Sequence, residues 1–342
     1  MSMASLNNVR LRDKALPELT VCIIGRNESQ NLPRCADSLL AMKDAEILYE
    51  SIYVDSASSD QSVCVAKEHL DVVITLAESP DLNASAARAV GTEHAQGEWI
   101  LYLDGDMILA PDFVPIIKKY LAQYNGAEGV AGRTLNRYPD GSSDFIVFHG
   151  NEDEKRCCAF GGAVMLKRDA VLQAGNWARN LYSNEEVELF SRLIKQNSQV
   201  FWTDVTMVEH VTEKFNTTGK FFGNFVPYRS FLGKKFYGAG QATRLSLSNG
   251  NFMFFVRLKL YQYLMTICLC ISSILVVFNV HAPLVLLAMI FSFISLKRGG
   301  KFAINCVCWA SQVFFGWRKF NPGFYPNVTG VYRRARVASI SS

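Results

Sequence analysis

An unbroken apolar run that ends in two carboxylates constrains the fold of this chain more than any other feature. Residues 100–103 are apolar or aromatic, and Asp104, Gly105 and Asp106 follow at once. A parallel strand that is buried on both faces reads as such a run, and ligands of open α/β sheets bind beyond the carboxyl ends of the strands. We therefore expect both carboxylates at the rim of a ligand crevice, where Gly105 leaves room for a ligand to approach the backbone.

Two carboxylates separated by one glycine also indicate the kind of ligand. Hard carboxylate oxygens suit Mg²⁺ or Mn²⁺, and Mg²⁺ usually binds proteins through one or two carboxylates together with substrate phosphates. Asp and Gly are also ordinary turn residues, so a plain polar turn after a strand is the alternative. The remainder of the chain decides between the two interpretations.

Three shorter β-rich runs precede this strand, at residues 19–24, 50–54 and 72–76. Strands that alternate with helical stretches at this spacing predict βαβ units. The predicted fold class is therefore α/β, with a Rossmann-like, mainly parallel sheet. Asp55 follows the second strand, where nucleotide-binding folds often contact ribose or base, although a turn acid or a helix N-cap is the alternative.

The charges divide the chain into two unlike parts. All 31 Asp and Glu residues lie at or before Glu213, whereas 16 of the 35 Lys and Arg residues lie after it. A long basic region without acids indicates a surface held against something anionic, and lipid headgroups are the leading candidate. Nucleic acid is the competing partner. We predict no nucleic-acid binding, because the same region contains long apolar segments.

Two apolar runs, residues 264–280 and 282–296, predict a membrane hairpin that enters from the cytoplasm and returns to it. Basic residues flank the pair at both ends and none lies between the runs, as the positive-inside rule requires. A buried core hairpin is the alternative. Residues 302–317 form a third apolar stretch. The basic residues at both of its ends predict that it is an interfacial or re-entrant segment.

The N-terminal residues and the cysteines indicate a cytoplasmic catalytic region. Residues 1–17 are polar and lack the apolar core of a secretory signal. The nine cysteines have neither metal-ligand spacing nor an even number for a disulfide framework. We expect reduced thiols, and Asn-x-Ser/Thr triplets that carry no glycan.

Four motifs in one order and spacing resemble the inverting glycosyltransferases of family 2, which have the GT-A fold. They lie at residues 20–28, 53–60, 86–88 and 103–106, and the resemblance covers about residues 18–213. It implies a nucleotide-diphospho-sugar transferase fold that takes a nucleotide-sugar donor, with uridine the default base, and Mn²⁺ or Mg²⁺. The implied roles are nucleotide binding for Glu28 and Asp55, a place near the base or phosphates for Arg88, sugar-nucleotide contact for Asp104 and metal binding for Asp106.

The resemblance also implies a catalytic base at residues 184–189, Asn-Glu-Glu-Val-Glu-Leu. The family usually has Glu-Asp-x-Glu-Leu here, with the Asp as base, so Glu186 takes that position with one additional methylene. Either Glu186 or Glu185 can accept a proton if it lies within hydrogen-bond reach of the acceptor. Helical spacing of these acids to Arg192 equally fits a solvated helix face with ion pairs. His210 matches a histidine that many relatives place near the metal, although a structural histidine is the alternative.

The acceptor side is predicted to include Gly161 and Gly162, together with Gln241 and Arg244. Residues 237–244 resemble a membrane-proximal segment of family 2 enzymes of exopolysaccharide assembly. Gln241 and Arg244 also fit the Gln-x-x-Arg-Trp signature of processive synthases, but Leu245 replaces the Trp. An amphipathic basic linker that lies on anionic lipid is the simpler interpretation.

These observations predict a membrane-anchored transferase that moves one sugar to a lipid-linked or glycan acceptor in polysaccharide or glycolipid biosynthesis. The catalytic domain is expected on the cytoplasmic face of a bacterial inner membrane. A processive synthase, a polyprenyl-phosphate glycosyltransferase and a catalytically silent nucleotide-sugar sensor are the alternatives. The predicted parts are an N-terminal extension (1–17), the GT-A domain (18–213), a basic interface segment (214–257), the membrane hairpin (258–298), and a third apolar segment with a basic tail (299–342).

Overall fold

The computed structural model describes residues 16–123, 126–146, 160–212, 231–277 and 320–334, with residues 287, 290–291, 313 and 315–318. Most of the predicted second run of the hairpin and most of residues 302–317 lie outside the described residues.

Four parallel strands form the centre of the sheet, as predicted. They are β1 (Leu19–Gly25), β2 (Tyr49–Asp55), β3 (Val72–Leu76) and β4 (Trp99–Asp104), in the spatial order β3-β2-β1-β4. The register pairs Gly25 with Asp55 and Ile24 with Asp104. Three strands therefore end at one level, and the polar residues after them meet at one edge of the sheet.

The sheet as a whole is mixed, which corrects the expectation of a mainly parallel one. Beyond β4 follow β8 (Val164–Lys167), β6 (Gly129–Arg137), β9 (Val200–Val211) and β5 (Met107–Leu109), and β7 (Ser143–Ile146) pairs with β6. All these pairings are antiparallel except β6 with β9. The chain here joins strands by turns and short helices instead of the repeated βαβ crossovers that produce parallel order.

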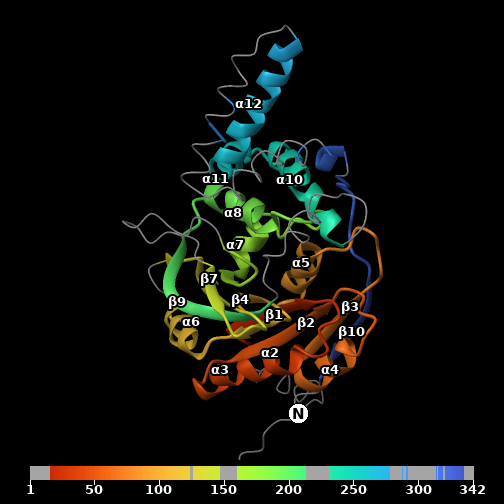
Figure 1. The fold of residues 1–342 in the computed structure, drawn as a ribbon. Helices are drawn as coiled ribbons and strands as arrows, with labels where there is room; N and C mark the ends of the chain where they lie inside the picture. The colour runs from red at the N-terminus through yellow and green to blue at the C-terminus, as the bar shows by residue number, and fades with distance from the viewer. Residues whose placement is uncertain are drawn as a thin grey trace, which may run out of the picture.

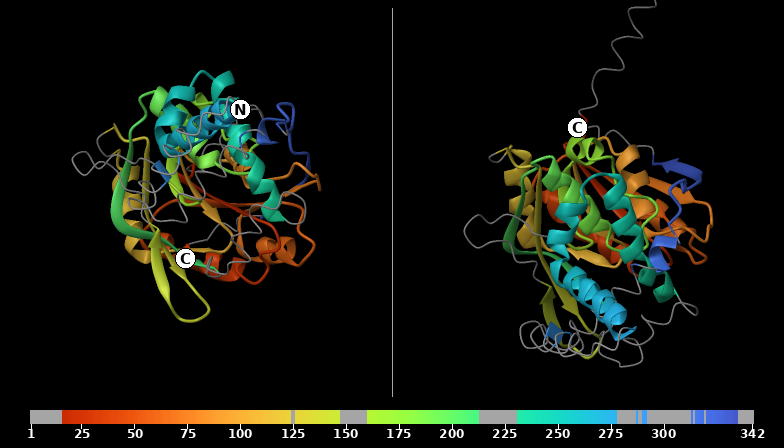
Figure 2. Two further views of the ribbon diagram at one scale, coloured as in Figure 1. Left: turned by 45° about the horizontal axis from the view of Figure 1, so that its top comes forward. Right: turned by 90° about the horizontal axis from the view of Figure 1, so that it is seen from above.

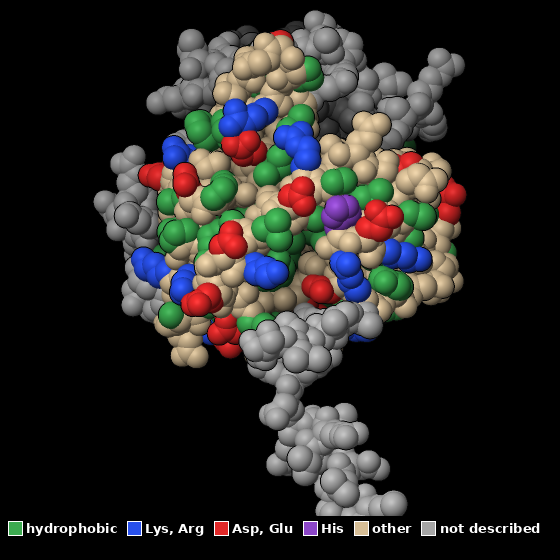
Figure 3. Space-filling model, turned by 90° about the horizontal axis from the view of Figure 1, so that it is seen from below, with side chains coloured by type: hydrophobic (Ala, Val, Ile, Leu, Met, Phe, Trp, Pro, Cys, Tyr) green, Lys and Arg blue, Asp and Glu red, His purple; other side chains and the backbone are tan. Residues whose placement is uncertain are grey.

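Helices cover both faces of this sheet (Figure 1). One face is covered by α2 (Leu32–Ser38), α3 (Leu40–Asp44), α4 (Ser62–His69) and α6 (Val114–Leu121), the last preceded by the short η1 (Pro111–Phe113). The other face is covered by α5 (Ala84–His94), α7 (Arg168–Gln173) and α8 (Glu185–Lys195). Seen from below, the molecule presents acidic, basic and hydrophobic side chains intermingled, with neither charge gathered into a patch (Figure 3).

Three helices from the acid-free region lie over α8, on the side away from the sheet (Figures 1 and 2). They are α10 (Phe231–Ser248), α11 (Phe252–Leu258) and α12 (Leu260–Val277). On α12 the side chains of Leu260, Leu264, Ile267 and Ile271 are about half exposed, at 44–53 %. Within the described parts of the chain, no helix combines the length and the apolar character needed to cross a membrane.

The C-terminal part of the chain returns to the sheet. Strand β10 (Val328–Arg333) pairs antiparallel with β3 and so covers the edge of the parallel half. The backbone N–H of Ala77 donates to the carbonyl of Asn327 (2.7 Å), and that of Arg334 donates to the carbonyl of Asp71 (2.7 Å). The sequence pattern assigned no strand here. An exposed edge strand has a weak local signal, because its pairing partner lies more than 250 residues away.

Candidate active site

A cavity of about 300 Å³ lies at the carboxyl edge of the parallel strands. Its walls come from the turns after β1 and β4, from Ser56 after β2, and from the start of α5. Three of the predicted residues line it, namely Glu28, Asp104 and Asp106. A Cβ atom at the turn residue Gly105 would lie 3.0 Å from Cγ of Glu28, so a larger residue there would have to displace the Glu28 side chain. Burial, and secondarily the nearby Asp106 and Asp104, raise the pKa of Glu28.

Asp106 and His210 lie together at one side of this cavity. Strand β5 pairs with β9 so that Met107 lies opposite His210, and this places the His210 Nε2 atom 3.1 Å from Oδ2 of Asp106. The Nδ1 atom of His210 lies 3.2 Å from Oδ1 of Asn136. The hydrogen bond to Asp106 raises the pKa of His210, against an opposing effect of burial.

These atoms fit a divalent metal ion. Oδ1 of Asp106 is buried and has no hydrogen-bond partner among the described residues, which is unusual for a carboxylate oxygen. If the Nδ1–H of His210 donates to Asn136, Nε2 would become a metal ligand on losing the proton that it shares with Asp106, the arrangement of a metal-binding histidine with an oriented ring. Within the described residues no group of three or more His, Cys, Asp or Glu side chains could hold a metal. Phosphate and water would have to supply the other ligands.

Arg88 connects the cavity residue Asp104 with the two glutamates at the start of α8. Its side chain is 2 % exposed, donates from Nη2 to Oδ1 of Asp104 (2.8 Å) and donates from Nη1 to Oε1 of Glu185 (3.2 Å). Oε1 of Glu186 lies 3.9 Å from Nη1, and the guanidinium carbon lies 5.1 Å from the ring centroid of Trp177. Burial alone would lower the pKa of Arg88, but the carboxylates outweigh it and raise this pKa. The structure therefore shows Arg88 as a buried bridge between acids.

The two candidate bases stand at the first turn of α8, after Asn184 in the left-handed conformation (φ 63°). Glu185 is buried and bonded to Arg88, whereas the side chain of Glu186 is 21 % exposed. Burial, followed by the charge of Glu185, raises the pKa of Glu186 to about 7, although Arg88 opposes the shift. A carboxylate with a pKa near the working pH is the type of group that serves as a general base.

The one remaining acid of α8, Glu188, has a structural role. Glu188 is fully buried and pairs with Arg192 one turn later, at 2.7 Å between Oε2 and Nη2. Arg192 Nη1 also donates to the carbonyls of Ala174 and Asn176. Glu188 and Arg192 thus form an ion pair at helical spacing, as one interpretation predicted. The pair lies in the core and not on a solvated helix face.

Asp55 lies buried behind the cavity lining. It accepts hydrogen bonds from the backbone N–H of Ser58 (2.9 Å) and from the hydroxyls of Ser58 (2.5 Å) and Tyr53 (3.3 Å). These bonds shape the loop after β2, as expected of a turn acid. Ser56, from the same loop, lines the cavity instead.

The predicted acceptor-side residues separate into two groups. Gly162 lies against Asp104 and Arg88, since a Cβ atom there would come within 2.6 Å of Oδ2 of Asp104, and Gly161 beside it is partly buried. Gln241 is buried in α10 and accepts from the backbone N–H of Tyr182 (3.1 Å), just before α8. Arg244 donates to the carbonyl of Trp317 (3.0 Å).

Sequence reasoning missed two residues of this site. Asn83 lines the cavity and caps α5, because its Oδ1 accepts from the backbone N–H of Ala86 (2.9 Å). An Asn before a helical stretch is a recognisable N-cap signal. Asn136, which contacts His210, stands near the end of β6 and has no local signal.

Comparisons with known proteins show which families and folds this chain is similar to. Residues 20–156 match the family model described as Glycosyl transferase family 2. The chain is 25 % identical over 187 residues to Glycosyltransferase AglE of Haloferax volcanii, which covers 52 % of this chain and 61 % of that protein. It is 32 % identical over 92 residues to the TPR repeat-containing protein Synpcc7942_0270 of Synechococcus elongatus, covering 27 % of this chain and 21 % of that one. The chain thus spans less than two thirds of either relative.

The overall fold is also similar to a solved structure. The mannosyltransferase PcManGT from Pyrobaculum calidifontis, in complex with GDP-Man and Mn²⁺, superposes with a TM-score of 0.58 over 93 % of each chain, at 14 % identity. At this identity the likeness concerns the fold. Residues 20–156, less than half of the chain, are thus similar to glycosyl transferase family 2, and the mixed α/β sheet is GT-A-like.

Proposed function

We propose that this protein is a metal-dependent, inverting glycosyltransferase that moves a sugar from a nucleotide-diphosphate donor to a hydroxyl of a membrane or lipid-linked acceptor. The observation that carries this proposal is the Arg88 bridge. One buried guanidinium binds Asp104, which lines the donor cavity, and Glu185, which adjoins the candidate base Glu186. A donor site and a proton acceptor are thereby held at one place, as group transfer requires.

In this mechanism Glu186 takes the proton of the acceptor hydroxyl as that oxygen attacks the anomeric carbon. Attack from the face opposite the leaving diphosphate inverts the anomeric configuration. Arg88 keeps Glu185 and Asp104 in position, and Glu185 raises the pKa of its neighbour so that Glu186 is a stronger base. The partly exposed side chain of Glu186 leaves access for an acceptor.

Asp106 and His210 are the residues that would hold Mn²⁺ or Mg²⁺. When bound, the metal neutralises negative charge that develops on the leaving diphosphate. The unpartnered Oδ1 of Asp106 supports this assignment. Glu28 and Asp104 line the same cavity and would contact the nucleotide sugar. Asp55 would act on the cavity indirectly, because it shapes the loop that places Ser56 in the cavity wall.

The donor is proposed to be a nucleotide-diphosphate sugar, with a UDP-sugar as the first choice. The structural neighbour that shares the fold binds GDP-Man, so GDP-sugars belong in the same test. The acceptor is proposed to be lipid-linked or at a membrane, on the cytoplasmic face. The half-exposed apolar row on α12 and the acid-free region after Glu213 support a lipid surface as partner.

Release of nucleotide diphosphate tests this function directly. The purified protein is supplied with UDP-, GDP- and dTDP-sugars and a crude lipid acceptor, in the presence of Mn²⁺, Mg²⁺ or EDTA. We expect release with one donor class and loss of release with EDTA. Metal-dependent binding without release, with acceptor present, would instead favour the nucleotide-sugar sensor.

The metal assignment has its own pair of variants. Asp106→Asn should weaken metal-dependent nucleotide binding at least tenfold, because it removes the charge of the proposed ligand. Asp112→Asn is the matched control, since Asp112 is an exposed acid at the start of η1. Calorimetric titration of nucleotide diphosphate with Mn²⁺ measures both variants. Equal affinities for the two variants would remove Asp106 from the metal site.

A further inference from the structure

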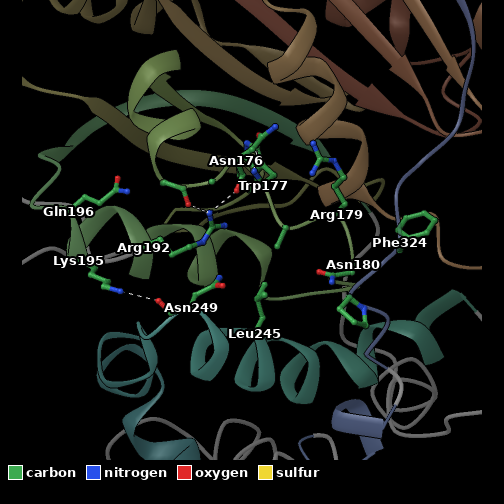
Figure 4. Close-up of a pocket in the computed structure, with 14 residues that line it drawn as sticks. Asn176, Trp177, Arg179, Asn180, Arg192, Lys195, Gln196, Leu245, Asn249 and Phe324 are labelled. Carbon is green, nitrogen blue, oxygen red and sulfur yellow. Dashed lines mark hydrogen bonds between the residues drawn. The ribbon is translucent and has the colours of Figure 1, made fainter.

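The loop of residues 178–184 leads directly into the candidate bases at the start of α8. A second cavity, of about 530 Å³, lies beside this loop. Its walls are the chain from Ala174 to Asn180, the C-terminal half of α8, α10 and the returning segment around Phe324 (Figure 4). In that view Asn180 and Asn249 extend toward the cavity, above Leu245. Void space next to a loop lets it shift unless hydrogen bonds fix it.

Hydrogen bonds from the loop that precedes α5 supply this fixation. The hydroxyl of Tyr182 donates to Oδ1 of Asp81 (2.6 Å). The side-chain amide of Asn83 donates to the carbonyl of Arg179 (2.7 Å). Asn83 also lines the donor cavity and caps α5, the helix of Arg88. The loop ahead of the bases is thus bonded to the loop at the donor site.

The returning C-terminal segment joins the same network. Asn321 donates from Nδ2 to Oδ2 of Asp81 (3.0 Å), and its carbonyl accepts from Nδ2 of Asn180 (3.1 Å). Each carboxylate oxygen of Asp81 therefore accepts one hydrogen bond, from Tyr182 and from Asn321. Burial, followed by the hydrogen bond and charge of Asp81, raises the pKa of Tyr182, so its hydroxyl remains a donor. Bonds to a charged acceptor are the stronger kind.

We propose that Asp81 and Tyr182 are positioning residues that hold Glu185 and Glu186 at the donor site, with Asn321 completing the network. This inference rests on the proposed glycosyl transfer. Tyr182 lies four residues before Glu186, and Asp81 lies two residues before Asn83, so one hydrogen bond connects the base to the donor cavity through short stretches of chain. Loss of that bond displaces the base without removing any group that contacts the donor.

Tyr182→Phe tests the proposal, with Tyr325→Phe as its matched control. Tyr325 donates its hydroxyl to Oε2 of Glu93 (3.0 Å) from the same C-terminal segment. Each substitution removes one hydroxyl-to-carboxylate hydrogen bond and keeps the ring. We expect Tyr182→Phe to lower kcat about 10- to 100-fold, since small misplacement of a catalytic group has effects of this size. The affinity for nucleotide diphosphate should stay within twofold of wild type, and Tyr325→Phe should leave kcat unchanged.

Two further readouts separate positioning from general stability. Hydrogen exchange of the backbone amides of residues 178–186 should be faster in Tyr182→Phe than in wild type, and unchanged in Tyr325→Phe. Both variants should keep the Tm of the wild type, so that the faster exchange reports the loop and not the whole fold. Asp81→Asn keeps an acceptor oxygen for Tyr182 and should retain more kcat than Asp81→Ala.

The outcomes distinguish this inference from the proposed function. If the wild type turns over and both Tyr variants match it in kcat and exchange, the positioning role is overturned. It is also overturned if both lose kcat equally. If the wild type itself never releases nucleotide diphosphate, the proposed function fails. In that case, unchanged hydrogen exchange in Tyr182→Phe also rejects the role of Tyr182 in fixing the loop. Faster exchange in Tyr182→Phe instead supports this hydrogen bond as a structural link between the two loops.

Discussion

Glu185 and Glu186 show at the scale of single residues how surroundings separate two identical side chains. Glu185 is buried and bonded to Arg88, while Glu186 keeps a longer, 3.9 Å contact and a raised pKa of about 7. The ionised form of a base is the active one, so the rate should rise with pH up to about 7 and level off above it. Glu186→Gln should lower kcat by about 10²- to 10⁴-fold.

Glu185→Gln decides which glutamate is the base. It keeps an acceptor for Arg88 but removes a negative charge that raises the pKa of Glu186. If Glu186 is the base, this variant should remain active, and the acid limb of its pH–rate profile should move to lower pH. The measurement is kcat/KM between pH 5 and 9. A collapse of activity in Glu185→Gln, with Glu186→Gln active, would reverse the assignment.

At the scale of elements, α8 carries the proposed base and a buried structural acid within one turn. Glu188 is fully buried and neutralises Arg192. Removing one partner of a buried ion pair leaves an uncompensated charge, at a cost of about 3–5 kcal/mol. Glu188→Gln should therefore lower the free energy of unfolding by this amount. Glu186→Gln is the control and should leave it unchanged or higher, because it relieves repulsion with Glu185. Urea denaturation of both variants measures the difference, and equal stabilities would contradict a structural role for Glu188.

Sequence alone could predict those elements whose signal is local. The runs of β1 to β4 and the acids at their ends are adjacent in the chain, so the parallel half and the donor cavity followed from them. The antiparallel half did not, because its strands do not repeat the strand-helix-strand spacing on which the parallel prediction rested. Both β10 and the bond from Asp81 to Tyr182 join residues that lie far apart in the chain, so neither has a local signal. The spacing of Glu188 and Arg192 is identical for an exposed and a buried ion pair, so only the packing of α8 could separate the two.

For the whole molecule, the arrangement of the chain gives a specific test of membrane association and orientation. The sheet and α8 lie on one side of α10 to α12, and β10 returns the C-terminal part to the sheet edge (Figure 1). We predict that the full chain, expressed in a bacterium, sediments with the membranes and resists a high-salt wash, because apolar burial does not weaken with salt. A protein found in the soluble fraction would contradict the predicted hairpin.

Orientation can be measured with Cys64, an exposed thiol on α4 of the catalytic region. A membrane-impermeant maleimide should label it in inside-out vesicles and not in intact spheroplasts, because the predicted hairpin leaves the catalytic region on the cytoplasmic side. Cys64→Ser identifies the labelled site among the other cysteines. Labelling that depends on Cys64 in intact spheroplasts would place the donor site on the outer face. It would then be separated from the cytoplasmic pool of nucleotide sugars that the proposed reaction consumes.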